Sequence, residues 1–324
     1  MFKVMIVFLA VIVILAVTYV IGPTVKIDVT TYPVSLPEDL ELYLSQTEQN
    51  ADLTIRDVAK KIVWANPEKK DRTKISLIYL HGYTATLMET HPLTEMIAKK
   101  LNANIFYTRL KGHGETKERF AEATANDWLS DTLEAWEIGK RIGDEVIIIA
   151  TSTGATLATW LALTQPVDQL KALIFISPNF WPADKTAPIL LWPWGVQIAK
   201  LTTGGEYHPW EPLNEGQEKY WMCSPSIRTS AQVVGLADYV NSLDIKELKA
   251  PVLVLYSELD DVVSVPKIKE KFELMGSPLK RLVAVNSENN PSKHVLAGDI
   301  VGFHTTEFVR EKIEEYLFSQ NLIP

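Results

Sequence analysis

Residues 147–157 read Ile-Ile-Ile-Ala-Thr-Ser-Thr-Gly-Ala-Thr-Leu, and this stretch decides the fold. An apolar, β-branched run stops at Ser152, and a stretch with helical character follows at once. This layout is typical of a nucleophile elbow, a tight turn that lifts a serine hydroxyl clear of its own backbone. Ser152 is the only serine in the chain with glycine two positions later. The alternative is an ordinary strand-to-helix junction in which Ser152 caps the helix.

Composition narrows the classes of function. The 324 residues suffice for one large α/β domain with an appendage, and the net charge of −8 argues against a nucleic-acid partner. Cys223 is the single cysteine, so an intramolecular disulfide is excluded. The sequence contains neither a clustered His/Cys ligand set nor a glycine-rich phosphate loop. We therefore expect no cofactor and no metal.

The N-terminus is strongly apolar. Residues 4–21 carry no charge and would form a helix of roughly 27 Å, close to the thickness of a bilayer core. A cleavable signal peptide would end at an A-x-A-like site, which is absent. We predict a retained single-pass anchor over 1–23. Lys3 before the span favours a cytoplasmic N-terminus, with the domain on the non-cytoplasmic side, periplasmic or extracellular.

The remainder alternates between strands and helices. Buried strands are expected at 75–80, 104–108, 146–150, 172–176, 252–256 and 280–285. Helices are expected at 37–49, 87–101, 126–142, 153–163, 266–275 and 299–318. Shorter strand-like patterns occur at 24–32 and 61–64. This order predicts an α/β fold with a mostly parallel central sheet flanked by helices. Residues 72–177 and 244–324 would form the core, with 24–71 as an N-terminal extension.

The alternation breaks over 178–243, which is rich in proline and holds five of the nine tryptophans. We predict a lid inserted on one side of the sheet. Its tryptophans would form a small satellite core, an apolar substrate pocket, or both. Trp181 is the candidate for substrate contact.

Other polar residues follow the strand ends, where parallel sheets place their active sites. His81-Gly82-Tyr83 follows the strand 75–80, and the glycine permits a sharp turn. The backbone N–H groups of Tyr83 and Thr153 would then form an oxyanion hole, and His81 and Gly82 would contact the substrate. The alternative is an ordinary glycine turn. A second loop, 109–114, carries His113, which we expect to be structural.

An acid and a base complete the set of candidate catalytic residues. Asp260 lies four residues beyond the strand 252–256, and we prefer it to its competitors Asp261 and Glu258. His294 follows the last strand through a polar loop long enough to reach the serine, whereas His304 falls in a helical pattern. The order Ser152, Asp260, His294 is the order of a Ser…Asp…His triad.

With these pieces the sequence resembles the α/β-hydrolase superfamily, and more narrowly its serine esterases and lipases of the monoglyceride lipase, lysophospholipase and carboxylesterase type. The matching motifs are 81–83, 112–114, 151–154, 257–263 and His294. Ala150 departs from the pattern where the first elbow glycine is usual, and Ser257 departs where glycine is frequent. The resemblance implies a triad that cleaves carboxylic esters through an acyl-enzyme.

The sequence indicates the class of substrate less directly than it indicates the reaction. A membrane anchor and a tryptophan-rich lid favour a small-molecule lipid or another apolar acyl ester. A thioesterase, an acyltransferase or a peptidase would use the same triad. An inactive, membrane-tethered binding protein on a hydrolase scaffold is the alternative from a different class.

Overall fold

A seven-stranded sheet forms the centre of the molecule in the computed structural model, which describes residues 2–323. The strand order is β1-β3-β2-β4-β5-β6-β7, and every neighbouring pair is parallel except β1 with β3. This confirms the predicted α/β class with a mostly parallel sheet. The strands are β1 (Lys61–Val63), β2 (Thr73–Leu80), β3 (Asn104–Tyr107), β4 (Gly143–Thr151), β5 (Leu170–Ile176), β6 (Val252–Tyr256) and β7 (Lys280–Ala284).

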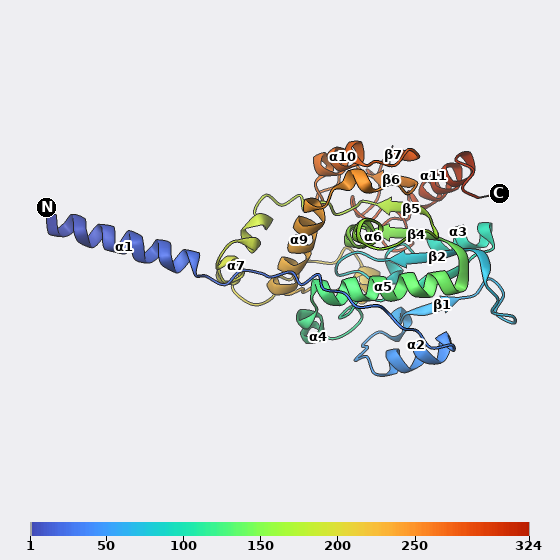
Figure 1. Cartoon of the computed structure of the whole chain (residues 1–324), viewed down its shortest axis with the longest axis horizontal. Helices are drawn as coiled ribbons and strands as arrows, with labels where there is room; N and C mark the ends of the chain where they lie inside the picture. Colours follow the sequence, from blue (N-terminus) through green and yellow to red (C-terminus); the bar gives the residue numbers. More distant parts are fainter. Residues whose placement is uncertain (1, 324) are drawn as a thin grey trace.

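Helices connect the strands and cover both faces of the sheet (Figure 1). The α-helices are α1 (Phe2–Val20), α2 (Leu40–Gln49), α3 (Leu93–Leu101), α4 (Lys117–Glu122), α5 (Ala125–Ile142), α6 (Thr153–Thr164), α7 (Gly195–Thr203), α8 (Glu215–Tyr220), α9 (Ile227–Ser242), α10 (Val265–Leu274) and α11 (Thr306–Ser319). Short 3₁₀ turns are η1 (Arg56–Val58), η2 (Leu87–Glu89), η3 (Ala187–Leu191) and η4 (Ile245–Glu247).

The strands bury side chains on both faces, which explains their continuous apolar runs. In β4, Ile148 and Ala150 face a core shared with α5, α6, α9 and α10. Ile147 and Ile149, between and beside them, face a second core shared with α3 and α11. Since successive strand residues point to opposite faces, one strand serves both cores. The sheet is therefore packed on both faces, and the carboxyl ends of its strands form a stable platform for side chains.

Helix α1 extends away from the domain as a separate rod (Figure 1). It is the one helix in the described residues that is long and apolar enough to cross a membrane, judged by length and composition. Its C-terminal end touches the segment around α7: the indole N–H of Trp194 donates to the carbonyl of Thr18 (2.8 Å), and the backbone N–H of Trp194 donates to that of Pro23 (2.9 Å).

The extension before β2 differs in part from its prediction. Residues 24–32 pair with no strand, so the expected strand there is wrong. Their alternation has a different cause: Val25, Ile27 and Val29 are half-buried while the residues between them are exposed. A Cβ on Gly235 of α9 would lie 2.5 Å from the Ile27 side chain, so this extended segment packs closely on that helix.

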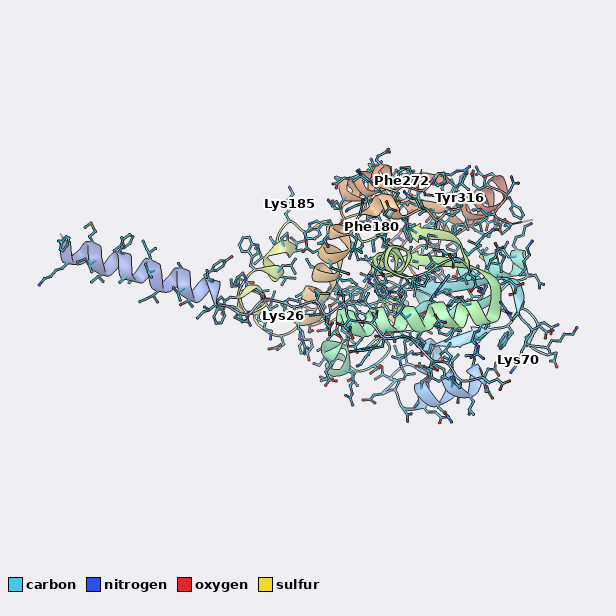
Figure 2. The ribbon with its side chains drawn as sticks, in the orientation of Figure 1. Lys26, Lys70, Phe180, Lys185, Phe272 and Tyr316 are labelled. Atoms are coloured by element: carbon cyan, nitrogen blue, oxygen red, sulfur yellow. The ribbon has the colours of Figure 1, made fainter. Side chains whose placement is uncertain are left out.

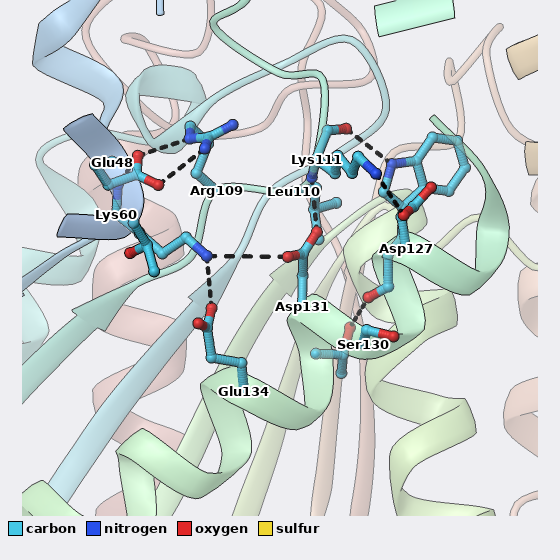
Figure 3. Close-up of polar contacts among 12 residues, drawn as sticks. Glu48, Lys60, Arg109, Leu110, Lys111, Asp127, Ser130, Asp131 and Glu134 are labelled. Carbon is cyan, nitrogen blue, oxygen red and sulfur yellow. Dashed lines mark hydrogen bonds and ion pairs between the residues drawn. The ribbon is translucent and has the colours of Figure 1, made fainter. Parts of the chain in front are cut away.

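Buried charges fasten the extension to the core (Figure 3). Glu48 of α2 accepts two hydrogen bonds from the guanidinium of Arg109 (2.7 and 2.8 Å), and Arg109 also donates to Glu115 (2.6 Å). Lys60 donates to Glu134 of α5 (2.7 Å). A buried ion pair is stable only when its two partners are well oriented toward each other. These pairs therefore fix the position of α2 beside the loop after β3.

Two expected helices begin later than their patterns indicate. The pattern over 87–101 is divided into η2 and α3 by the dipeptide His91-Pro92, because proline is poorly tolerated inside a helix. The pattern over 299–318 becomes helix only at Thr306. His304 therefore lies in the turn before α11 and not within it.

Candidate active site

Ser152 sits on a sharp turn between β4 and α6. Its φ of 52° and ψ of −117° lie in a region that non-glycine residues rarely adopt. The turn is held because the Ser152 N–H donates to the carbonyl of Ile176 (2.9 Å). Gly154 is required next to it, since a Cβ there would lie 2.1 Å from the carbonyl oxygen of Leu80. This is the strained strand–turn–helix geometry of a nucleophile elbow.

His294 and Asp260 form a hydrogen-bonded pair at the same edge of the sheet. Nδ1 of His294 lies 2.8 Å from Oδ2 of Asp260. The other carboxylate oxygen of Asp260 accepts the backbone N–H groups of Val262 (2.9 Å) and Val263 (3.0 Å). The carbonyl of His294 accepts a hydrogen bond from the hydroxyl of Ser177 (2.7 Å). The acid is therefore fixed by its own loop, and the histidine is fixed from two directions.

The pair shifts the pKa of each partner. Burial favours the neutral imidazole, but the charge and hydrogen bond of Asp260 outweigh it and raise the pKa of His294 above 6.5. Burial likewise opposes ionisation of Asp260, but the nearby His294 and the two backbone N–H groups outweigh it and lower its pKa below 3.8. The arrangement therefore suits a histidine that accepts a proton during a reaction and is stabilised in its charged form.

The turn at residues 81–84, here called the oxyanion turn, lies beside the elbow. Nδ1 of His81 is 2.9 Å from the Gly82 carbonyl, and Nε2 of His81 accepts the backbone N–H of Leu110 (3.1 Å). These partners select the neutral Nδ1–H tautomer, and burial lowers the pKa of His81 to about 4. Within residues 2–323, the backbone N–H groups of Tyr83 and Thr153 donate to no protein atom. Both donors are free for a bound oxygen.

A cavity of about 510 Å³ joins these parts. Ser152, Thr153, Tyr83 and His294 all line it. Among the described residues, no hydrogen bond links the Ser152 hydroxyl directly to His294, and such bonds commonly tighten only once substrate is bound. Much of the wall is apolar, with contributions from Trp210, Leu213, Trp221, Val233, Val263 and Val295. The cavity can hold an apolar chain next to a polar reaction centre.

Three residues expected to contact substrate are absent from the set of residues that line the cavity. His81 is fully buried behind the oxyanion turn, with both ring nitrogens engaged by backbone groups. Gly82 and Trp181 are also outside the set of residues that line the cavity. The wall instead uses Trp210 and Trp221, which pack in a satellite cluster of their own.

The other residues considered from the sequence, Glu258, Asp261 and His113, make contacts that differ from those of Asp260 and His294. Glu258 is tied to Tyr256 and Lys269. Asp261 lines the cavity but makes no contact with Nδ1 of His294, which Asp260 occupies. His113 is buried against the rings of His81 and Phe120, in keeping with the expected structural role.

Sequence reasoning missed several polar residues of the cavity, among them Glu89 and Asn179. The amide group of Asn179 reaches the hydroxyl of Thr153 (3.4 Å). Asn179 lies three residues beyond the end of β5, so its position after a strand end is a signal that could have found it. Glu89 lies in η2, nine residues beyond β2, and no sequence pattern singles it out.

Comparisons with known proteins identify the family and the fold. A protein-family model described as serine aminopeptidase, S33, matches residues 71–287. The curated thermostable monoacylglycerol lipase of Bacillus sp. (strain H-257) is 29% identical over 102 residues. That match takes in 32% of this chain and 40% of the lipase, so the chain aligns with less than half the length of this relative.

Solved structures share the fold at low identity. One of the metagenome-derived lipolytic enzymes LipS and LipT gives a TM-score of 0.67 at 19% identity, over 82% of this chain and 99% of the other. A soluble variant of monoglyceride lipase from Saccharomyces cerevisiae gives 0.61 at 12% identity, over 94% of this chain and 99% of the other. At these identities the similarity establishes the fold alone.

Proposed function

The chain belongs to the serine aminopeptidase S33 family of α/β-hydrolases, and from this premise we propose that it cleaves carboxylic esters through Ser152, His294 and Asp260. One observation carries the proposal. A serine on a strained elbow and a histidine hydrogen-bonded to a carboxylate line the same cavity, beside two free backbone N–H groups. These are the parts that acyl transfer by a serine requires.

The proposed reaction has two steps. His294 takes the proton of the Ser152 hydroxyl as its oxygen attacks the ester carbonyl, and Asp260 stabilises the imidazolium that forms. The N–H groups of Tyr83 and Thr153 hold the oxyanion. His294 then protonates the leaving alcohol, which departs and leaves an acyl group on Ser152. Water, deprotonated by the same histidine, releases the acid and restores the serine.

We propose an apolar acyl ester as substrate and residues 178–243 as the lid above it. The apolar wall supports this, because Trp210, Leu213 and Trp221 from that segment would surround an acyl chain. The similarity to a monoacylglycerol lipase points in the same direction. The oxyanion turn is tied to this segment as well, since the Tyr83 hydroxyl bonds the hydroxyls of Thr229 and Ser230 on α9.

A peptidase is the second candidate. The family description names an aminopeptidase, and such a substrate would present an ammonium group. Glu211 and Asp261 on the cavity wall would attract that charge. The extent of apolar wall favours the ester.

We further propose that α1 is a membrane anchor that places the domain on the non-cytoplasmic side. The domain surface beside the anchor fits a bilayer, because Trp192, Ile198 and Leu201 around α7 are exposed there. Lys26 and Lys185 project from the same end of the domain (Figure 2), where they would meet anionic headgroups. Residues 24–71 would act as the extension that ties this anchor to the core.

One panel tests the reaction. The chain without residues 1–23 is assayed with p-nitrophenyl esters of increasing chain length, a matched thioester and an aminoacyl anilide, beside its Ser152→Ala variant. We expect ester turnover that rises with chain length up to a limit and is abolished in the variant. Undiminished turnover by the variant would reject the mechanism. Faster cleavage of the anilide would favour the peptidase. No turnover by a folded wild type would indicate a binding protein.

The anchor needs its own measurement. The full chain and the chain without residues 1–23 are compared for co-sedimentation with phosphatidylcholine/phosphatidylglycerol vesicles, and the mass of the membrane-bound form is determined. We expect only the full chain to be integral and its N-terminal peptide to be retained. Loss of that peptide from the mature protein would identify a signal peptide instead.

A further inference from the structure

Glu89 is a buried carboxyl group in the cavity wall, and the proposed reaction leaves it without a role. Its side chain is 2% exposed, and it lines the same cavity as Ser152 and His294. It reaches this place from η2, which follows the oxyanion turn by only a few residues. A buried carboxylate is costly unless hydrogen bonds compensate for the lost water, so its partners indicate what it does.

One carboxylate oxygen joins two structural elements. Oε2 of Glu89 accepts the backbone N–H of Gly82 (2.8 Å) and the hydroxyl of Tyr79 on β2 (3.0 Å). The Tyr79 hydroxyl is also 3.2 Å from the hydroxyl of Thr151, the residue before the nucleophile. Glu89 thus connects the oxyanion turn to the base of the elbow.

The other oxygen occupies the space beside Gly82. A Cβ on Gly82 would lie 2.7 Å from Oε1 of Glu89 and 3.1 Å from Cβ of Ser152. The glycine is therefore enclosed between the carboxyl group and the nucleophile. The backbone of Gly298 lies close against that of Glu89, since a Cβ on Gly298 would lie 2.7 Å from the Glu89 carbonyl oxygen. Neither the turn nor the carboxyl group can shift alone.

The direction of the Tyr83 N–H follows from these contacts. The peptide unit between Gly82 and Tyr83 is planar, so its N–H points opposite to its C=O. His81 and Ala85 hold that C=O (2.9 and 3.2 Å). Glu89 holds the preceding unit through the Gly82 N–H. With both units fixed, the Tyr83 N–H stays free at the cavity.

We propose that Glu89 is a positioning residue for the oxyanion hole: its carboxylate holds the Gly82 amide so that the Tyr83 N–H faces the reacting carbonyl. This rests on the proposed ester hydrolysis and adds to it a fourth side chain, outside the triad, on which the rate depends. The hydrogen bond to Gly82 is strongest when the carboxylate is ionised, because charge-assisted bonds are roughly twice as strong as neutral ones.

The pKa of Glu89 is raised from the ordinary value of a glutamate carboxyl group. Burial raises its pKa to about 7, and the Gly82 N–H, the nearby His294 and the Tyr79 hydroxyl limit the rise. The titratable groups that face it are Tyr79 from β2 and His294 from the loop after β7. Burial raises the pKa of Tyr79 well above 10, so Tyr79 stays a neutral donor. Glu89 and His294 therefore titrate as a coupled pair.

The test compares Glu89→Gln and Glu89→Leu with wild type, each as the full chain in detergent. Glutamine keeps a neutral acceptor of the same shape, whereas leucine removes it. At pH 8 we expect kcat to fall about 3- to 10-fold for glutamine and about 100-fold for leucine at similar KM, since a lost oxyanion donor costs about 10²–10³ in kcat. Glu95→Gln is the matched control, because that side chain lies toward Tyr107 and His91.

The pH profile gives a readout that a purely structural role would not alter. On the acid side, log(kcat/KM) should fall in wild type by an extra 3- to 10-fold beyond a slope of 1, because Glu89 gains a proton as well as His294, whereas Glu89→Gln should follow a slope near 1 throughout. Activity is normalised to the fraction of molecules labelled by a fluorophosphonate, which removes any loss through misfolding. Equal normalised kcat and equal slopes in wild type and both variants would overturn the proposal. Absence of ester turnover in wild type would instead reject the proposed function itself.

Discussion

Nδ1 of His294 and Oδ2 of Asp260 lie 2.8 Å apart, although 34 residues separate them in the chain. The second oxygen of Asp260 is committed to the N–H groups of Val262 and Val263, so the carboxylate cannot rotate away. This bond fixes which nitrogen of His294 carries the proton and leaves Nε2 available to accept the Ser152 proton in the proposed reaction.

Replacing Asp260 by asparagine should lower kcat/KM for p-nitrophenyl butyrate by a factor on the order of 10⁴, because the amide favours the wrong tautomer of His294. The matched control is Asp261→Asn, one residue along the same loop, which should lose less than about threefold. A larger loss in Asp261→Asn than in Asp260→Asn would exchange the roles of the two acids.

The pH dependence follows from the raised pKa of His294. The reaction needs this histidine neutral, so kcat/KM should rise with pH through an apparent pKa above 6.5 and fall on acidification. In Asp260→Asn the main cause that raises the pKa of His294 is gone, although Glu89 and Asp261 remain, and the residual activity should begin to rise at lower pH. A full pH–rate profile of both proteins checks this, and an unchanged midpoint would contradict it.

Substitution of Trp210 tests whether the apolar wall of the cavity binds an acyl chain. Trp210→Ala should raise KM about tenfold for a decanoate ester and leave KM for an acetate ester nearly unchanged, because about 1–2 kcal/mol of apolar contact is lost only by the long chain. Trp192→Ala is the control, since that side chain is 51% exposed and outside the cavity. Equal effects of the two substitutions would argue against an acyl pocket at Trp210.

The buried ion pair between Glu48 and Arg109 tests the attachment of the extension. Glu48→Ala should lower the free energy of unfolding by roughly 3 kcal/mol, because it removes two hydrogen bonds from a buried guanidinium and leaves it only Glu115 and the His113 carbonyl among the described residues. Urea unfolding followed by circular dichroism measures the change. Glu118→Ala, at an exposed pair with Lys117, should cost less than about 0.5 kcal/mol. A neutral Glu48→Ala would mean that α2 contributes little to the fold.

The sequence predicted the sheet well because parallel strands carry long apolar runs and end in polar loops. The run over 252–256 coincides with β6, and the acid and histidine expected beyond the last strands do meet. The strand expected at 24–32 was wrong because alternating burial against a helix leaves the same pattern as alternating burial in a sheet. A pattern of burial does not say what covers the buried face.

The inner wall of the cavity was less predictable for a different reason. Glu89 is held by Gly82, by Tyr79 and, through its backbone, by a glycine more than 200 positions later. Its neighbours in the chain give no sign of these contacts. Trp181 is the tryptophan expected to contact substrate, but Trp210 and Trp221 line the cavity, and nothing in the composition of 178–243 indicates which tryptophan faces inward.

The most direct measurement is the site of covalent labelling by a fluorophosphonate, read by peptide mass spectrometry on the chain without residues 1–23. The expected result is one adduct per molecule on Ser152, no adduct in Ser152→Ala, and strongly slowed labelling in His294→Ala. A stoichiometric adduct on another serine, or a wild type that is folded yet unlabelled, would contradict the assignment of Ser152 as the nucleophile.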